Sequence, residues 1–171
     1  LDVHSGTCVP GVGLSTYHGL QACVVPPNTG VFDIFKSGPT STGGMTSCSQ
    51  YALRGPANSF GILALGATDP NSNFGGLLCA PLRANPDIYA GYFVFSDATG
   101  SVASSAAPIS LTFPNLLAPF TIYTQFVMVD PARVRPQMAV SLSDAIKWEV
   151  TAPEPRVRRH IYSTSSNTAL T

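Results

Sequence analysis

The residues best suited to chemistry in this sequence are four cysteines in its first half: Cys8, Cys23, Cys48 and Cys79. They contain no CxxC pair, and His4 and His18 do not complete a zinc-finger spacing, so a metal site is the weaker interpretation. Their even number favours two disulfides. Three connectivities are open and the sequence does not decide among them; of the three we favour Cys8 with Cys23 and Cys48 with Cys79. Four reduced thiols buried in a core are the alternative.

A second candidate site is the stretch 69–76, where Asp69, Asn71 and Asn73 offer oxygen atoms at the alternate positions of a calcium loop. Phe74 stands where that loop needs its sharp-turn glycine, and Ala80 stands where it needs a bidentate glutamate. We therefore expect a polar turn here, with no bound metal and no other cofactor.

No constellation for catalysis is evident in the sequence. There is no G-x-S-x-G elbow, and the three histidines lie in the N-terminal region and the tail. A glycosidase would need two opposed carboxylates, and a pair such as Asp33 with Asp130 would be arbitrary. Asp97, Asp130 and Asp144 are explained more simply as turn residues at strand ends. We predict no catalytic residues and no enzyme activity.

Aromatic residues are concentrated in the second half of the chain. They could form a sugar-stacking surface if several shared an exposed face, but aromatic side chains in strands usually belong to the core. Trp148 lies between Lys147 and Glu149, so alternation predicts that it points inward while its neighbours point outward. The residues concerned are Tyr89, Tyr92, Phe93, Phe95, Phe120, Tyr123, Phe126 and Trp148.

The elements that must position these residues are predicted to be strands. Apolar, β-branched and aromatic runs follow one another from residue 89 to 150 without a helical period. Residues 91–96 and 101–113 flank the turn 97–100, which indicates a hairpin. The run 120–129 is apolar at odd and even positions, so we expect a central strand covered on both faces. Residues 137–143 and 145–150 are predicted as a closing pair of strands.

The first half of the chain gives further short strands separated by loops. We expect strands within 15–25, 31–35, 49–55, 59–66 and 76–83, and loops at 37–47 and 69–76. The total of about nine or ten strands predicts an all-β, antiparallel β-sandwich or jelly roll. A mixed α+β domain is the alternative, but the chain contains no convincing amphipathic helix.

The composition excludes several partners. Charged residues make up 11% of the chain, against about 25% in average soluble proteins. The formal net charge is zero, which argues against nucleic acid as a partner. No apolar run is long enough for a transmembrane helix. The absence of an initial Met and of a signal-peptide pattern is compatible with a mature, secreted chain, and an expressed fragment would look the same.

The last residues differ from the rest, so we divide the chain into a β-sandwich domain, 1–151, and a C-terminal tail, 152–171. Prolines open the tail and three arginines follow closely. A solvated, disordered terminus is one interpretation. The other is a contact arm that adds as a strand to the sheet edge of a neighbouring subunit. Its residues would be Arg156, Val157, Arg158, Arg159, Ile161 and Tyr162.

Four segments of the chain support a resemblance: NSFGILALG (58–66), GGLLCAPL (75–82), FTIYTQFVMVDP (120–131) and MAVSLSDAIKWEV (138–150). Together they resemble a loosely defined group of predicted secreted β-domains that is abundant in planctomycetes and some other bacteria. The resemblance covers about the last three-fifths of the chain and implies a secreted β-sandwich without assigned catalytic residues. The N-terminal part with Cys8 and Cys23 and the arginine-rich tail have no match in this group.

Low charge, many Ser and Thr residues and a predicted arm favour a secreted or cell-surface structural protein. We expect it to self-associate into a homopolymer, as a subunit of an extracellular filament or surface layer. A carbohydrate-binding or adhesion module, with glycans as partners, is the alternative. An enzyme and a viral jelly-roll coat protein are weaker hypotheses, the latter because net neutrality leaves only the short tail to meet nucleic acid.

Overall fold

The computed structural model describes residues 6–7, 14–18, 22–25, 30–42, 44–87, 89–114, 119–133 and 137–150. The regular structure of these residues consists of strands, without a helix, so the all-β class is confirmed. The strands are β1 (Gly6–Thr7), β2 (Leu14–His18), β3 (Asp33–Thr42), β4 (Met45–Leu53), β5 (Phe60–Gly66), β6 (Tyr89–Phe95), β7 (Ile109–Pro114), β8 (Phe120–Val129) and β9 (Val140–Val150).

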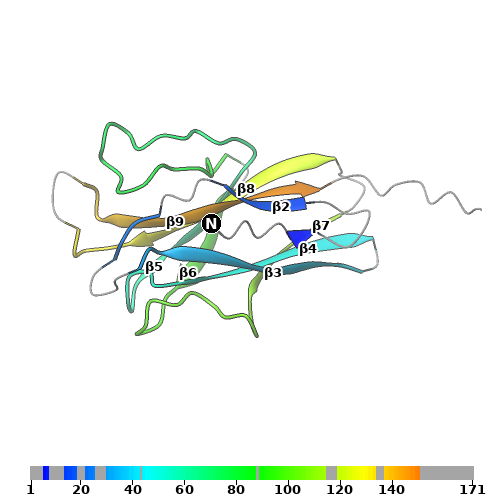
Figure 1. The fold of residues 1–171 in the computed structure, drawn as a ribbon, viewed down its shortest axis with the longest axis horizontal. Helices are drawn as coiled ribbons and strands as arrows, with labels where there is room; N and C mark the ends of the chain where they lie inside the picture. Colours follow the sequence, from blue (N-terminus) through cyan, green and yellow to red (C-terminus); the bar gives the residue numbers. More distant parts are fainter. Residues whose placement is uncertain are drawn as a thin grey trace, which may run out of the picture.

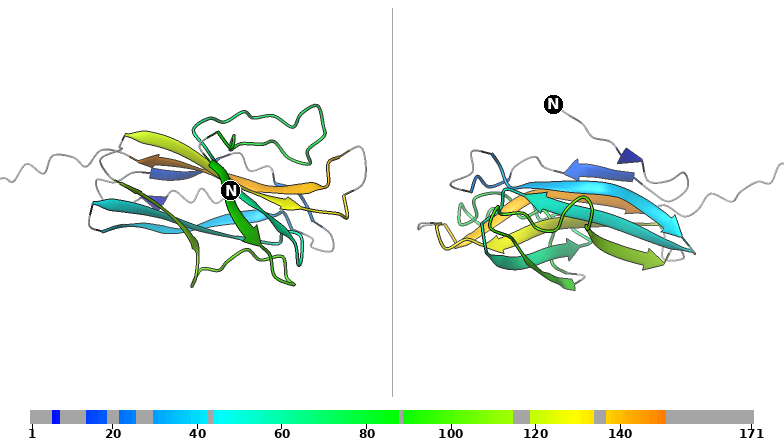
Figure 2. Two further views of the ribbon diagram at one scale, coloured as in Figure 1. Left: turned by 180° about the vertical axis from the view of Figure 1, so that it is seen from behind. Right: turned by 90° about the horizontal axis from the view of Figure 1, so that it is seen from below.

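The strands form two antiparallel sheets. One has the order β1-β2-β9-β8-β5-β6 and the other the order β3-β4-β7. Figure 1 shows β3 and β4 running beneath β8 and β9, and the second view of Figure 2 shows the same two layers from below. Strand β6 forms one edge of the larger sheet, because among the described residues it pairs with β5 alone.

The main core lies between these sheets and draws on both. Its largest side chain, Trp148 on β9, is completely buried, while Lys147 and Glu149 on either side are partly exposed, as alternation predicted. The smaller sheet contributes Ile34, Cys48, Ala52 and Leu111. The larger sheet contributes Leu63, Leu65, Val94, Ile122, Phe126, Met128, Ile146 and Trp148.

The prediction of a central strand at 120–129 is confirmed. Strand β8 pairs with β5 on one side and β9 on the other, and Thr124, Gln125 and Phe126 are all buried. Both faces are covered because a long connection, described over residues 67–87, folds over the outer face of the sheet. Gln125 fixes that cover: its Oε1 accepts the Arg83 N–H at 2.9 Å, and its Nε2 donates to the Pro81 carbonyl at 3.1 Å.

The hairpin predicted around residues 97–100 is wrong, although the turn itself forms. The Asp97 carboxylate accepts the backbone N–H groups of Thr99 and Ser101 at 2.8 and 2.9 Å. Strand β6 pairs with β5, whereas β7 pairs with β4 in the other sheet. The connection crosses between the layers and bridges Val102 to Ala52 on the way. The Asp97 turn is compatible both with a hairpin and with this crossover between the sheets.

Three other predicted boundaries change. Residues 37–42, predicted as loop, continue β3, and a register shift between Ser37 and Thr40 accommodates the intervening Pro39. The two strands predicted at 137–143 and 145–150 form a single strand, β9. The register of its pairing with β8 shifts between Gln125 and Val127. Residues 76–83 are not a strand of the sheet but belong to the covering connection, which has a single bridge between Ser72 and Leu82.

Candidate functional site

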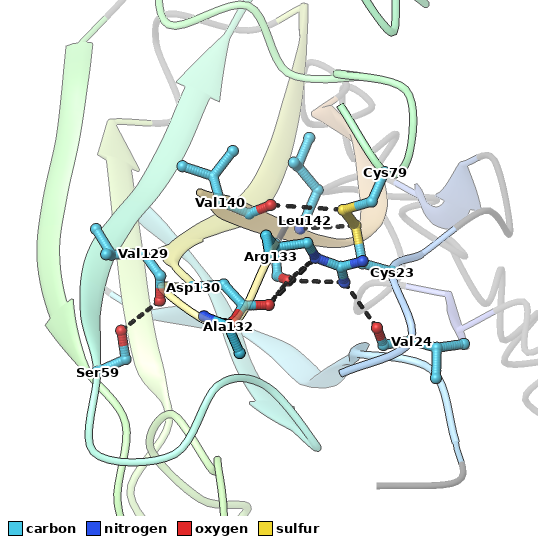
Figure 3. A network of polar contacts seen from close by, with 11 residues as sticks. Cys23, Val24, Ser59, Cys79, Val129, Asp130, Ala132, Arg133, Val140 and Leu142 are labelled. Carbon is cyan, nitrogen blue, oxygen red and sulfur yellow. Dashed lines mark hydrogen bonds and ion pairs between the residues drawn. A yellow bond between two sulfur atoms is a disulfide. The ribbon is translucent and has the colours of Figure 1, made fainter. Parts of the chain in front are cut away.

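The densest polar cluster joins the β8–β9 turn to the N-terminal segment. Asp130 directly follows β8 and is buried. Its Oδ2 accepts the Ser141 hydroxyl at 2.6 Å and pairs with Arg133 Nε at 3.2 Å. Arg133 Nη2 donates to Ser141 Oγ at 2.9 Å and to the Val24 carbonyl at 2.6 Å. Figure 3 shows the guanidinium reaching across from the turn to residues 23 and 24.

This cluster has the geometry of a structural clamp. Ser141 is completely buried, and its hydroxyl oxygen already contacts the carboxylate and the guanidinium. A nucleophile needs an exposed oxygen and a base free to take its proton, and neither condition is met here. Asp130 also accepts the Ala132 N–H at 3.2 Å, which places it at a turn as predicted.

A disulfide lies beside the clamp and corrects the predicted pairing. Cys23 is bonded to Cys79, with 5.5 Å between their Cα atoms, so the pairs Cys8–Cys23 and Cys48–Cys79 are wrong. The bond joins the covering connection to the N-terminal segment at Cys23, which is hydrogen-bonded to β9: Cys23 Sγ accepts the Leu142 N–H at 3.1 Å (Figure 3). Cys48 is buried in the core between the sheets, and Cys8 lies outside the described residues.

The bond also closes a second apolar cluster on the outer face of the sheet. Cys23, Leu78, Ala80 and Leu142 are its buried members. Val127 on β8 and Val140 on β9 pack against them. The covering connection therefore shields the β8–β9 half of this face.

The stretch 69–76 forms polar turns, as predicted. Asp69 accepts the Asn71 N–H at 2.8 Å, and its other carboxylate oxygen pairs with Arg83 Nη1 at 3.2 Å. The Asn73 side-chain oxygen accepts the Gly76 N–H at 3.3 Å. Among the described residues, no group of three or more His, Cys, Asp or Glu side chains is placed to hold a metal ion.

Asp144 is not the turn residue that was predicted. It lies within β9 with its side chain nearly buried, and among the described residues no hydrogen-bond partner reaches its Oδ1. Burial raises the pKa of this carboxyl from the ordinary 3.8 to about 6, because the anion loses its hydration. Ionisation of this buried carboxyl therefore lowers the free energy of unfolding at neutral pH.

Asp144→Asn is therefore expected to stabilise the protein above pH 6. Between pH 4 and 6 the unfolded chain releases the Asp144 proton while the folded chain keeps it, so the free energy of unfolding falls as pH rises. The Asp144→Asn variant has no carboxyl to ionise and avoids this fall. Its free energy of unfolding at pH 7 should exceed the parent's by roughly 2 kcal/mol, after allowance for screening. The substitution should change little below about pH 3, where the carboxyl is protonated in both states. Urea unfolding at a series of pH values measures this difference.

Asp97→Asn is the matched control, because hydrogen bonds from Thr99 and Ser101 lower the pKa of the exposed Asp97 carboxyl. Its contribution to stability is present at neutral pH and is lost in acid, the opposite direction from Asp144. An Asp144→Asn variant with the parent's slope between pH 4 and 6 would contradict the assigned pKa.

The aromatic residues named from the sequence divide into buried and exposed sets. Phe126 and Trp148 are core residues, and Phe120 and Tyr123 are half-buried. On β6, Phe93 is 81% exposed and Phe95 is 74% exposed, while Tyr92 is also exposed. Nothing is described of the Tyr89 side chain.

Phe60 on β5 joins the exposed set, although the sequence reasoning did not single it out. It is 55% exposed and pairs directly with Phe95. The sequence contained one signal for it: Phe60 lies two residues before Ile62, so strand alternation places both side chains on the same face of the sheet. We name Phe60, Phe93 and Phe95 together the aromatic edge.

The aromatic edge continues the outer apolar face beyond its cover. One cross-strand row runs from Phe93 to Ile62, Val127 and Leu142, and the exposure falls along it from the edge strand to the buried Leu142. The covering connection thus protects the β8–β9 end of the row and leaves the β5–β6 end open. Neither β5 nor β6 contains a charged residue. This is the candidate functional surface.

The predicted contact arm lies outside the described residues, as does the whole segment 151–171. Its proposed contact residues, none of them described, are Arg156, Val157, Arg158, Arg159, Ile161 and Tyr162.

No protein-family description, curated protein or solved structure matches the sequence. No helix in the part of the chain that the structure describes is long and apolar enough to cross a membrane. The function must therefore be inferred from the residues themselves.

Proposed function

We propose that the protein is a secreted structural β-sandwich without catalytic activity, which self-assembles as a subunit of an extracellular filament or surface layer. The observation that carries this proposal is the aromatic edge. Three phenylalanine side chains, each more than half exposed, stand together on an uncharged edge of the larger sheet. Contiguous apolar patches of this kind mark interaction surfaces in soluble proteins.

The edge strands of the smaller sheet, β3 and β7, differ from β6 because they carry features that oppose association. Strand β3 carries Lys36 and a register shift between Ser37 and Thr40, and β7 ends at Pro114. Lysine, proline and irregular register are the devices by which proteins prevent edge-to-edge association. In β6 a register shift affects only the end near Tyr89, and the stretch 92–95 has none of these devices.

An extracellular setting is supported by the disulfide and by the low charge. A bond between Cys23 and Cys79 persists in oxidising compartments and is rare in the cytosol. The resemblance to secreted bacterial β-domains supports the same location.

A carbohydrate-binding or adhesion module is the second candidate, because exposed aromatic rings on one face can stack on sugars. Assembly is favoured because phenylalanine has no polar group to orient a hydroxyl-rich ligand, and β5 and β6 offer no charged side chain beside it. Binding to a polysaccharide array that is lost in a Phe93→Ala variant would support this candidate instead.

The proposal predicts ordered, concentration-dependent assembly of the purified chain. Size-exclusion chromatography with light scattering counts the subunits, and electron microscopy shows whether larger material is ordered. Removal of residues 152–171 should weaken the growth of polymers if the tail is a contact arm. A chain that stays monomeric up to about 0.1 mM, where even weak specific contacts would populate complexes, would contradict the proposed function.

A further inference from the structure

Strand β6, green in the left view of Figure 2, pairs on one side with β5 and has no second neighbour among the described strands. We propose that this edge pairs antiparallel with β6 of a second copy of the chain, with Val94 on the two-fold axis. This inference rests on the proposed assembly function and names its first contact.

The backbone of β6 is oriented for such pairing. Ser96 N–H donates to the Ser59 carbonyl at 2.9 Å, so Ser59 and Ser96 are a hydrogen-bonded pair at the start of the β5–β6 ladder. Hydrogen-bonded and non-hydrogen-bonded pairs alternate along antiparallel strands. Gly61 and Val94 are two pairs further along the ladder, so they are again a hydrogen-bonded pair, and the backbone N–H and C=O of Val94 point toward β5. The backbone N–H and C=O groups of Phe93 and Phe95 therefore point away from β5, toward the proposed partner strand.

The side chains select one register. With Val94 on the axis, Phe93 lies opposite Phe95 of the partner subunit, and the symmetric pair repeats it. Four phenylalanine rings then meet on one face of the joined sheet, and aromatic pairs are among the cross-strand contacts that stabilise sheets. A register centred on Phe93 would instead place Phe95 opposite Gly91 of the partner subunit, where there is no side chain to contact.

Exposed apolar area is available at this edge. A phenylalanine buries about 150–250 Å² when fully covered, so Phe93 and Phe95, 81% and 74% exposed, leave roughly 300 Å² of ring surface per subunit. Pairing of the two strands covers the part of this surface that faces the opposed ring, together with the edges of both backbones, whereas Phe60 lies one strand away on β5. The contact therefore belongs to the small interfaces, below about 1,200 Å², that are typical of weak association.

This contact closes on itself. A two-fold interface uses the same surface on both subunits, so β6 pairing gives a dimer and goes no further. A filament or layer then requires a second, different contact between dimers, a role open to the contact arm.

Cysteine pairing tests the register. Two single variants, F93C and F95C, are oxidised separately and as a mixture, and analysed on non-reducing gels beside the unmodified chain, which reports any background from the native cysteines. Opposed residues of a hydrogen-bonded pair have Cα atoms about 5.5 Å apart, a distance that a disulfide spans. We expect a cross-linked dimer only in the mixture. Equal cross-linking of F93C with itself, or none in the mixture, would overturn the register.

Sedimentation equilibrium tests the surface itself. Phe93→Lys places two like charges at the interface and should weaken the dimer at least about tenfold, whereas Met45→Lys, at an exposed apolar residue of the other sheet, should leave it within about twofold. Circular dichroism confirms that both variants fold. Assembly that survives Phe93→Lys would overturn β6 pairing and leave the proposed function standing. An unmodified chain that never associates would overturn both.

Discussion

Replacing Cys23 and Cys79 together by alanine is expected to lower the free energy of unfolding by about 4 kcal/mol. The bond joins residues 56 positions apart, and a loop of that length loses about this much entropy in the unfolded chain when it is closed. The bond also holds Leu78 and Ala80 over Leu142, so its removal loosens the cover of the outer face. Urea unfolding of the oxidised parent and the variant measures the difference.

Reduction supplies the control for this experiment. Reducing the parent chain should produce the same loss as the double substitution, within about 1 kcal/mol, because both remove the same constraint. Proteolysis should also accelerate within residues 67–87, the covering connection that the bond secures. A variant with the parent's unfolding midpoint and the parent's cleavage rate would show that the covering connection is held by its other contacts, such as those of Gln125.

Local patterns predicted the elements of this fold well, because they depend on burial along one strand at a time. The run 120–129 is apolar at both parities, and only a strand covered on both faces tolerates that pattern. Trp148 points inward because its two neighbours are charged. The Asp97 turn follows from side-chain oxygens that accept local N–H groups.

The pairing of elements could not be predicted in the same way. A turn such as 97–100 continues equally well into a hairpin or into a crossover, and the choice depends on the distant partners β4 and β5. Cys23 meets Cys79 because the covering connection returns over β9, a path that no local spacing encodes.

The aromatic edge shows both what local patterns predict and what depends on strand pairing. Alternation places Phe93 and Phe95 on the same face of their strand, but core and surface strands of this chain have the same apolar composition. Phe126 on the central β8 is completely buried, whereas Phe93 on the edge β6 is the most exposed large apolar residue described. The order of strands in the sheet, rather than the residue type, separates the two.

Trp148→Ala is expected to cost about 3–5 kcal/mol, the range for removing a buried aromatic side chain that leaves a cavity. The indole is completely buried between the sheets, and its Nε1 donates to Thr124 Oγ1 at 3.0 Å. Thr124 in turn donates to Gln50 Oε1 at 2.6 Å, so this chain of hydrogen bonds joins β9, β8 and β4 across the core. A loss of this size is a large part of the stability of a typical domain.

Trp148→Phe separates the hydrogen bond from the volume. It keeps most of the ring but removes the donor, and should cost about 1–2 kcal/mol. Thr124→Val breaks the same bond from the other side and leaves both Trp148 Nε1 and Gln50 Oε1 unpaired, so it should cost more. Because the two substitutions share one contact, the double variant should lose less than the sum of the two singles. Additive losses, measured by urea unfolding of all four proteins, would show that packing alone joins the sheets here and that the Trp148–Thr124 bond contributes nothing.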